Sequence, residues 1–251
     1  NLIRDLRRAP GNGELQLHYQ AKLSLSSGRV EQAEALLRWL HPQYGMVSPG
    51  EFIPLAEDLN LIIPMTLSLL DRALGDLKQW SEAGFNLYIS VNLSTRHLEQ
   101  EDLAIQTSNL LKKYQLPASC LRFEVTESAL MQDHESAIAT MLALSELGVQ
   151  LALDDFGTGY SSLKYLKELP IDGIKIDRSF VKDIGIDRND ETIIDAMLSM
   201  ASSLGMYCVA EGVETEQQLA FFSQRGCHLI QGYLFGKPMA ADQLIRKLQQ
   251  N

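Results

Sequence analysis

Two adjacent carboxylates, Asp154 and Asp155, stand at the end of a short apolar run that begins at Val149. Short runs of this kind are typical of buried parallel strands, and α/β proteins carry their chemistry at the carboxyl ends of such strands. Neighbouring acids repel each other and resist burial unless a cation compensates them. Capping of a helix expected to start near Tyr160 would explain one aspartate but not two. We therefore interpret the pair as metal ligands.

Further polar side chains are expected near the carboxyl ends of the other strands. From the second strand onward, every strand contributes a charge or an amide, and the aspartate pair is joined by Glu34, Asn92, Glu124, Lys175, Glu211 and Gln231. In a closed barrel these ends converge on one face. Strand ends are often polar, which explains any single residue of the set but not the whole series. Oxygen ligands without His or Cys favour magnesium or manganese, and clustered carboxylates are typical of two-metal phosphodiester hydrolysis.

Eight expected strands position these side chains. The first two, residues 15–23 and 29–37, are joined by a turn far too short for a parallel crossover, so they are expected to be antiparallel. Helices are expected over residues 2–8, from Ser48 onward and over 65–83. Strands and helices then alternate over 86–91, 100–114, 121–125, 134–147, 149–153, 161–169, 173–176, 191–204, 207–210, 216–225, 229–233 and 241–248. The alternation and the length of 251 residues favour an α/β fold, a TIM-like (β/α)8 barrel with an antiparallel first strand.

Composition narrows the class of protein. With 45% hydrophobic and 22% charged residues, residues 1–251 are expected to form a single globular domain, and the direct start into a helix indicates that it comes from a longer protein. No apolar stretch approaches the ~20 residues of a transmembrane helix, and no signal peptide is visible. The net charge of −10 argues against a nucleic-acid polymer as partner. Three scattered cysteines indicate a reducing compartment, and the unpaired histidines argue against zinc.

The motifs resemble those of the EAL domain family. Glu34-Ala35-Leu36-Leu37-Arg38 corresponds to the motif that names the family. Six further motifs follow in family order: Val91-Asn92-Leu93-Ser94, Glu124-Val125-Thr126-Glu127, Asp154-Asp155-Phe156-Gly157-Thr158-Gly159, Lys175-Ile176-Asp177, Glu211-Gly212-Val213-Glu214 and Gln231-Gly232-Tyr233. Seven ordered motifs, from about residue 15 to the end, make the resemblance specific. One departure is Ala21, where the family usually has proline, and it concerns only the shape of the first strand.

The resemblance implies an enzyme of bacterial signalling that hydrolyses the second messenger cyclic di-GMP to linear pGpG. It implies two Mg²⁺ or Mn²⁺ ions, with Asp154 bridging between them, and the implied ligands are Glu34, Asn92, Glu124, Asp154, Asp155 and Glu211. Calcium is expected to inhibit, because its coordination is larger and looser.

The resemblance also implies roles for the remaining motif residues. Lys175 would contact the attacking water, with Glu34 and Glu211 in the catalytic set, although a simple counter-ion to Asp154 is the alternative for Lys175. The implied substrate contacts are Gln20, Arg38, Asp177 and Gln231. A guanidinium suits a phosphate contact at Arg38, but a salt bridge on the barrel rim explains this residue equally well.

Two loop acids, Glu127 and Glu214, are expected to support the site without binding metal. Glu127 follows the fourth strand, where it would abut the loop over 157–162 and accept hydrogen bonds from it; a solvated loop position is the alternative. The implied partners are the substrate and a second copy of the chain in a homodimer. The implied location is cytoplasmic, with any membrane attachment through other domains.

Two other functions are considered. A catalytically inactive module that only binds cyclic di-GMP is the first, but such relatives usually lack metal ligands or the loop after the fifth strand, and this chain retains both. A magnesium-dependent barrel of the enolase type is the second, and the ordered motifs count against it. Metal-dependent hydrolysis of cyclic di-GMP is therefore the expected function.

Overall fold

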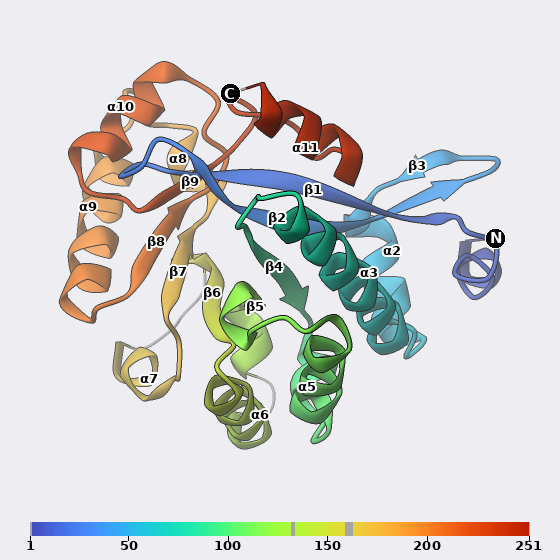
Figure 1. Cartoon of the computed structure of the whole chain (residues 1–251). Coiled ribbons are helices and arrows are strands. Elements are labelled where there is room, and N and C mark those ends of the chain that lie inside the picture. The colour runs from blue at the N-terminus through green and yellow to red at the C-terminus, as the bar shows by residue number, and fades with distance from the viewer. Residues whose placement is uncertain (1, 132–133, 159–162, 251) are drawn as a thin grey trace.

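The computed structural model of the chain describes residues 2–131, 134–158 and 163–250 (Figure 1). Its centre is a nine-stranded sheet in the order β1-β9-β8-β7-β6-β5-β4-β2-β3, which closes on itself through pairing of β1 with β2. The strands are β1 (Leu15–Ser24), β2 (Val30–His41), β3 (Gly45–Val47), β4 (Tyr88–Leu93), β5 (Leu121–Thr126), β6 (Gln150–Phe156), β7 (Gly173–Ile176), β8 (Tyr207–Ala210) and β9 (Leu229–Gln231). Because β3 pairs only with β2, the other eight strands make the closed barrel.

The first strand is antiparallel to both of its neighbours, as the short first turn predicts. β1 pairs antiparallel with β2, with Gln20 opposite Glu34, and antiparallel with β9, with Lys22 opposite Gln231. All other pairs within the barrel are parallel. The predicted TIM-like barrel with an antiparallel first strand is therefore confirmed.

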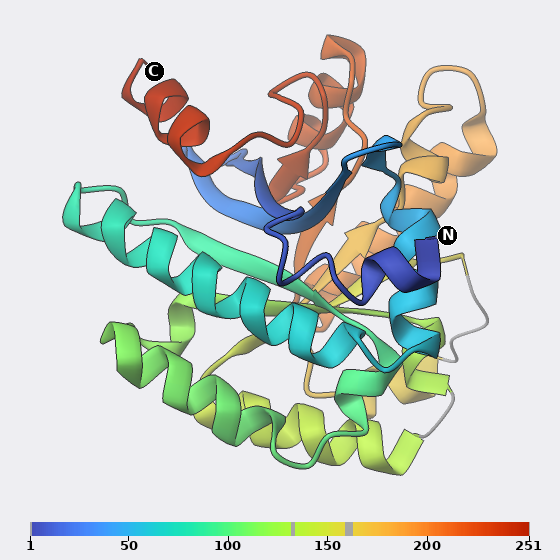
Figure 2. The same ribbon diagram turned by 90° about the vertical axis from the view of Figure 1, so that its right-hand side faces the viewer.

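Helices surround the barrel on the outside (Figures 1 and 2). They are α1 (Leu2–Leu6), α2 (Pro49–Asp58), α3 (Ile62–Glu82), α4 (Thr95–Leu98), α5 (Leu103–Tyr114), α6 (His134–Leu147), α7 (Leu163–Glu168), α8 (Arg178–Val181), α9 (Arg188–Ser203), α10 (Glu216–Gln224) and α11 (Ala241–Gln249), with short 3-10 turns η1 (Ala118–Cys120) and η2 (Ser128–Met131). None of the described helices is both long and apolar enough to cross a membrane.

The structure differs from the expected elements in a few places. β2 continues to His41 rather than ending at residue 37, and the extension pairs with β3, which the sequence did not indicate. The extension lets Trp39 join a second small core under α1 and α2. The helix expected over 100–114 is α5, which begins three residues later than expected, at Leu103. A separate short helix, α4, precedes it and was not expected; a capping box of Ser94 and His97 starts it. The expected helix start at Ser161 lies outside the described residues.

The barrel separates an apolar outer layer from a polar interior. Successive strand residues point to opposite sides of the sheet. On β5, Phe123 and Val125 belong to the main hydrophobic core, while Glu124 between them is buried on the other side. Lys22 and Lys175 are also fully buried, although TIM barrels usually fill their interior with branched aliphatic side chains. The interior of this barrel is therefore built to carry charge.

Candidate active site

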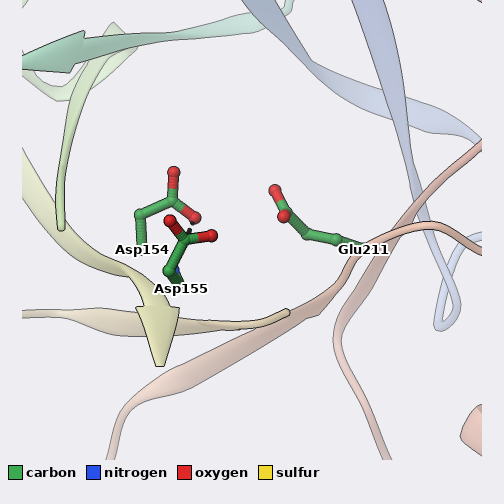
Figure 3. Close-up of side chains that lie close together, drawn as sticks. All are labelled: Asp154, Asp155 and Glu211. Carbon is green, nitrogen blue, oxygen red and sulfur yellow. Dashed lines mark hydrogen bonds between the residues drawn. The ribbon is translucent and has the colours of Figure 1, made fainter. Parts of the chain in front are cut away.

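Three carboxylates meet at the carboxyl ends of β6 and β8. Asp154, Asp155 and Glu211 each offer an oxygen, and these oxygens all lie within 4.8 Å of one another. In Figure 3 the two aspartates extend from the end of β6 toward Glu211, which follows β8 on the opposite side. The set is oxygen-only, with Asp154 buried and the other two acids half-buried, so it fits a hard divalent cation. The sequence-based expectation that these strand ends converge is confirmed.

The backbone at Asp155 explains how two adjacent side chains reach the same site. In a regular strand, neighbouring side chains point to opposite faces. Asp155 instead has φ +53°, and the pairing of β6 with β7 shifts register between Leu153 and Phe156. The Asp155 amide donates to Asp154 Oδ1 at 2.9 Å. A left-handed conformation is costly for a residue with a side chain, so the local fold holds both carboxylates together against that cost.

Gly157 supports this turn from behind. Its φ is +94°, and a Cβ there would lie 2.1 Å from Met197 Cε of α9 and 3.2 Å from Phe180. Only glycine combines this conformation with such close packing. The turn that carries Asp155 is thus pressed against α8 and α9, which explains the first glycine of the loop in structural terms.

Lys175 lies at the centre of the acids. It is almost fully buried, and its Nζ lies 2.7 Å from Glu211 Oε1, 3.1 Å from Asp154 Oδ2 and 3.7 Å from Glu34 Oε2. It also donates to Glu124 Oε2. Burial acts against its charge, but the surrounding carboxylates outweigh this and hold its pKa well above the ordinary value. In the absence of metal, Lys175 is therefore an ammonium that neutralises part of the cluster.

A second buried lysine, Lys22, completes the charge pattern and was missed by the sequence analysis. Its Nζ pairs with Glu124 Oε1 and donates to Ser90 Oγ at 2.9 Å. The available signal was its position on the first strand, two residues after Gln20 and hence on the same face. Burial acts to raise the pKa of Glu124, but the two lysines outweigh it and lower that pKa.

A network of amides holds Glu34 at the opposite side of the cluster. Asn92 Nδ2 donates to Glu34 Oε1, and Gln231 Nε2 donates to Glu34 Oε2, each at 2.7 Å. Gln231 Nε2 also donates to Gln20 Oε1 at 2.9 Å. The two glutamines expected to contact substrate thus lie beside the expected metal ligands Glu34 and Asn92.

Asp154, Asp155 and Glu211 hold protons more strongly than free carboxyls. Burial is the largest cause of the raised pKa of Asp154, which is about 6. Lys175 acts to lower this pKa, and the neighbouring carboxylates act to raise it. Burial likewise raises the pKa of Glu211 to about 8. The pKa of Asp155 is raised by burial and by neighbouring Asp177. These shifts show that burial, reinforced by the neighbouring carboxylates, disfavours the charged forms of Asp154, Asp155 and Glu211, and a bound cation would stabilise those forms.

The remaining predicted residues surround this centre. Asp177 caps α8, because its carboxylate accepts from Ser179 N at 2.9 Å. Arg38 is half-buried and donates to the Leu37 carbonyl at 3.0 Å, and its guanidinium forms no rim salt bridge with any described residue. Glu127 is 4% exposed, so the alternative of a solvated loop position is wrong. The loop residues 159–162 that Glu127 was expected to hold lie outside the described part of the chain.

Two cavities flank the cluster and share the side chain of Leu36. One, of about 270 Å³, contains the acids and is lined by Gln20, Glu34, Leu36, Asp154, Lys175, Arg178, Glu211, Gly212, Glu214, Gln231, Gly232 and Tyr233. The other, of about 510 Å³, lies between β2, β4 and α2 and includes Arg38, Asn92, Glu57 and Ser94 in its lining. The carboxylates therefore line the smaller cavity, and the larger cavity adjoins it at Leu36.

Comparisons with known proteins agree with this geometry. The EAL domain family matches residues 3–238. The chain is 42% identical over 245 residues to the Pseudomonas aeruginosa protein named bifunctional diguanylate cyclase/cyclic di-GMP phosphodiesterase MucR, an alignment that covers 97% of this chain and 36% of that protein. It is 45% identical over 236 residues to cyclic di-GMP phosphodiesterase NbdA of the same organism, covering 94% of this chain and 30% of NbdA. The chain thus spans about a third of the length of these relatives.

A solved structure described as "PaMucR Phosphodiesterase, c-di-GMP complex" superposes with a TM-score of 0.92. It is 43% identical in sequence, and the superposition covers 97% of this chain and 99% of that one. The ordered motifs, the irregular barrel and the match over residues 3–238 agree. The chain belongs to the EAL domain family.

Proposed function

We propose that this chain hydrolyses cyclic di-GMP to linear pGpG in a reaction that depends on divalent cations. The observation that carries the proposal is the convergence of Asp154, Asp155 and Glu211 beside the buried ammonium of Lys175, at a cavity that adjoins a second cavity at Leu36. The names of MucR and NbdA, and the cyclic di-GMP complex of MucR, support the same substrate. The EAL phosphodiesterase family is metal-dependent, which agrees with the acidic cluster.

We assign two ions, Mg²⁺ or Mn²⁺, to the cluster. One would be held by Glu34, Asn92, Glu124 and Asp154, and the other by Asp154, Asp155 and Glu211. For the first set, Asn92 would turn its amide oxygen rather than its NH₂ toward the ion, and the hydrogen bond that it now gives to Glu34 would be lost. Bound divalent cations would lower the pKa of a water molecule and neutralise phosphate oxygens.

Lys175 has a separate role in this proposal. Its ammonium donates to both Asp154 and Glu211, so it already lies among the groups that would surround the attacking water. With cations bound to the carboxylates, the same ammonium would be free to donate to the water or to a phosphate oxygen. Glu34 and Glu211 would help to orient the reacting groups, since both lie near Lys175. The distance from Lys175 Nζ is 3.7 Å to Glu34 Oε2 and 2.7 Å to Glu211 Oε1.

The substrate would lie across the barrel mouth. Cyclic di-GMP has two nucleotide halves, and the two cavities on either side of Leu36 provide a place for each. Arg38, Gln20, Asp177 and Gln231 are the expected contacts, with the guanidinium of Arg38 suited to a phosphate. Glu214 lines the smaller cavity and is assigned to support of its loop. A local cation is needed because the chain as a whole carries a net charge of −10.

We also infer that the chain forms a homodimer, acts in the cytoplasm and does not take a nucleic-acid polymer as substrate. These inferences rest on the family resemblance and on the acidic net charge. Sedimentation of the purified chain over a range of concentrations tests the dimer directly. A monomer at every concentration would reject it without affecting the proposed chemistry.

Turnover of cyclic di-GMP, followed by chromatography of pGpG, tests the proposed reaction. We expect turnover with Mg²⁺ or Mn²⁺, none in EDTA, and inhibition when Ca²⁺ competes, because its looser coordination positions the reactants less well. Binding of cyclic di-GMP without turnover in Mg²⁺ or Mn²⁺ would identify the alternative, an inactive binding module. Equal turnover in EDTA and in Mg²⁺ would reject the metal-dependent reaction.

A further inference from the structure

Lys22 is a fully buried charged residue of the barrel interior. It has no exposed surface and enters the barrel from β1, the strand that runs against the others. Its Nζ pairs with Glu124 Oε1, donates to Ser90 Oγ at 2.9 Å and lies 4.0 Å from Glu34 Oε2. No ion pair of Lys22 with Asp154 or Glu211 is found in the described structure. Glu124 is the acid that Lys22 contacts most closely, with Glu34 farther away, so Lys22 acts on the site chiefly through Glu124.

Glu124 divides its two oxygens between two ammonium groups. Oε1 faces Lys22 and Oε2 faces Lys175. Lys175 must also serve Asp154 and Glu211, at 3.1 and 2.7 Å. Because Lys22 supplies Glu124 with a partner of its own, Lys175 is not the only counter-charge for this fully buried carboxylate. The two lysines thus have different neighbours even though they share one acid.

Loss of Lys22 would disturb both of the other groups. Glu124 Oε1 would be left buried without its ionic partner, which is costly for a charged oxygen. The carboxylate would turn toward Lys175, the remaining cation, and draw that ammonium away from Asp154 and Glu211. The change in position, rather than the lost charge alone, would then impair the site.

We propose that Lys22 is a positioning residue for the reaction. It holds Glu124 through Oε1 and thereby keeps Lys175 in contact with Asp154 and Glu211. Its effect on turnover rests on the proposed function. Its effects on cation binding and on the stability of the metal-free protein do not. A lysine that merely fills space or offsets charge would behave differently in both of these measurements.

Replacement of Lys22 by methionine, Lys22→Met, retains most of the side-chain length and removes the ammonium. We expect kcat to fall about 10- to 100-fold, the size typical of lost support for metal ligands, with KM changed by less than about threefold. Mn²⁺ affinity, measured without substrate by titration calorimetry, should weaken by about tenfold. Simple removal of a positive charge predicts the reverse, tighter binding of the cation. Unchanged or tighter Mn²⁺ binding, or wild-type kcat, would overturn the proposal.

Two further variants separate positioning from misfolding. Lys112→Met makes the same change at an exposed lysine on α5 and should leave all three quantities unchanged. In EDTA, Lys22→Met should melt at a lower temperature than the wild-type protein. The same substitution in a Glu124→Gln protein should have a much smaller effect, because the anion that Lys22 pairs with is then absent. Equal effects in both backgrounds would also overturn the proposal. If no variant and no wild-type protein turns over cyclic di-GMP, the proposed function fails, while calorimetry and melting still decide the role of Lys22.

Discussion

The two ends of the barrel interior accommodate charged side chains in different ways. The mouth lies at the carboxyl ends of the parallel strands, and the floor lies at their amino ends. At the floor, Arg122 near the start of β5 donates to Gln150 Oε1 at 2.7 Å and to Gln32 Oε1 at 2.5 Å. Its guanidinium lies between the rings of Tyr88 and Tyr207, at 4.8 and 4.6 Å from their centroids. Neutral groups thus satisfy this cation, and the arrangement is complete without a ligand.

The mouth of the barrel is unbalanced by comparison. Lys22 and Lys175 face Glu34, Glu124, Asp154 and Glu211, and Asp155 adds a further acid at the edge. Burial and the neighbouring acids raise the pKa values of Asp154 and Glu211 even though Lys175 acts to lower them. In TIM barrels the mouth carries activity, whereas residues at the opposite end serve stability. We therefore expect the acids at the mouth to serve ligand binding and Arg122 at the floor to serve the stability of the fold.

The largest expected effect follows from removing one charge at the mouth. Asp154→Asn should reduce kcat by more than about a thousandfold, about 4 kcal/mol in the barrier, because Asp154 is the proposed bridge between cations. The Mg²⁺-induced rise in melting temperature should also shrink, since binding to the folded state causes that rise. Turnover and melting with and without Mg²⁺ measure both. Asp102→Asn, at an exposed helix N-cap where Asn serves equally well, is the control.

The opposite pattern is expected at the floor. Arg122→Met removes two hydrogen bonds and two ring contacts, which should cost about 2–3 kcal/mol of stability. The melting temperature should fall by roughly 5–10 °C for a chain of this size. In contrast, kcat at a permissive temperature and the rise in melting temperature with Mg²⁺ should stay near their wild-type values. A loss of turnover larger than the loss of folded protein would show that the two ends are not independent.

The pH dependence of stability sharpens the comparison further. The pKa of Glu211 rises from its ordinary 4.5 to about 8 on folding, and that of Asp154 from 3.8 to about 6. The folded protein therefore holds protons that the unfolded chain has released, so stability is lost as the pH rises through these folded values. Glu124, with its lowered pKa, acts in the opposite sense and loses its contribution on acidification below its ordinary 4.5.

The melting temperature of the metal-free protein should accordingly fall between about pH 5 and pH 8. Glu211→Gln should remove the upper part of this slope, because its side chain no longer titrates. Arg122→Met should lower the whole curve without changing its slope. Melting curves in EDTA across this range provide the measurement, and a flat profile in the wild type would contradict the surplus of charge at the mouth.

Much of this architecture follows from local sequence. Helix 134–147 and strands 173–176 and 207–210 have the predicted bounds. The helix ends at Leu147 because Gly148 adopts a positive φ. The convergence of the strand-end acids also follows from the order of strands. The short α4 and α8 were missed, since four-residue helices depend on local capping rather than on periodicity.

The rest depends on contacts between distant segments. Lys22 and Arg122 are charged residues on expected strands, and only the register of the closed barrel shows that each finds its partners inside. The left-handed backbone of Asp155 is equally invisible in the sequence, because a regular strand would have sent its side chain away from Asp154. In each case, nonlocal packing determines the environment that gives the residue its role.

The smallest expected effect concerns Glu127, a buried acid at the mouth that belongs to neither the lysine pairs nor the group of Asp154, Asp155 and Glu211. It follows Thr126, the β5 residue paired in register with Asp154 on β6. Its carbonyl accepts from Leu130 N at 3.3 Å, which fixes the backbone of this connection. A carboxylate held so close to the end of β6 is suited to support the turn that carries Asp155.

Glu127→Gln keeps the shape of this side chain and removes its charge. We expect kcat to fall about tenfold, as for changes that loosen the support of a metal ligand, while the melting temperature falls by no more than a few degrees. Glu101→Gln, at an exposed position, is the matched control. Turnover at saturating Mg²⁺ alongside a thermal melt distinguishes this behaviour from that of Arg122→Met, where stability falls and kcat does not. Wild-type turnover in Glu127→Gln would place this acid with the structural residues, although it lies at the mouth of the barrel.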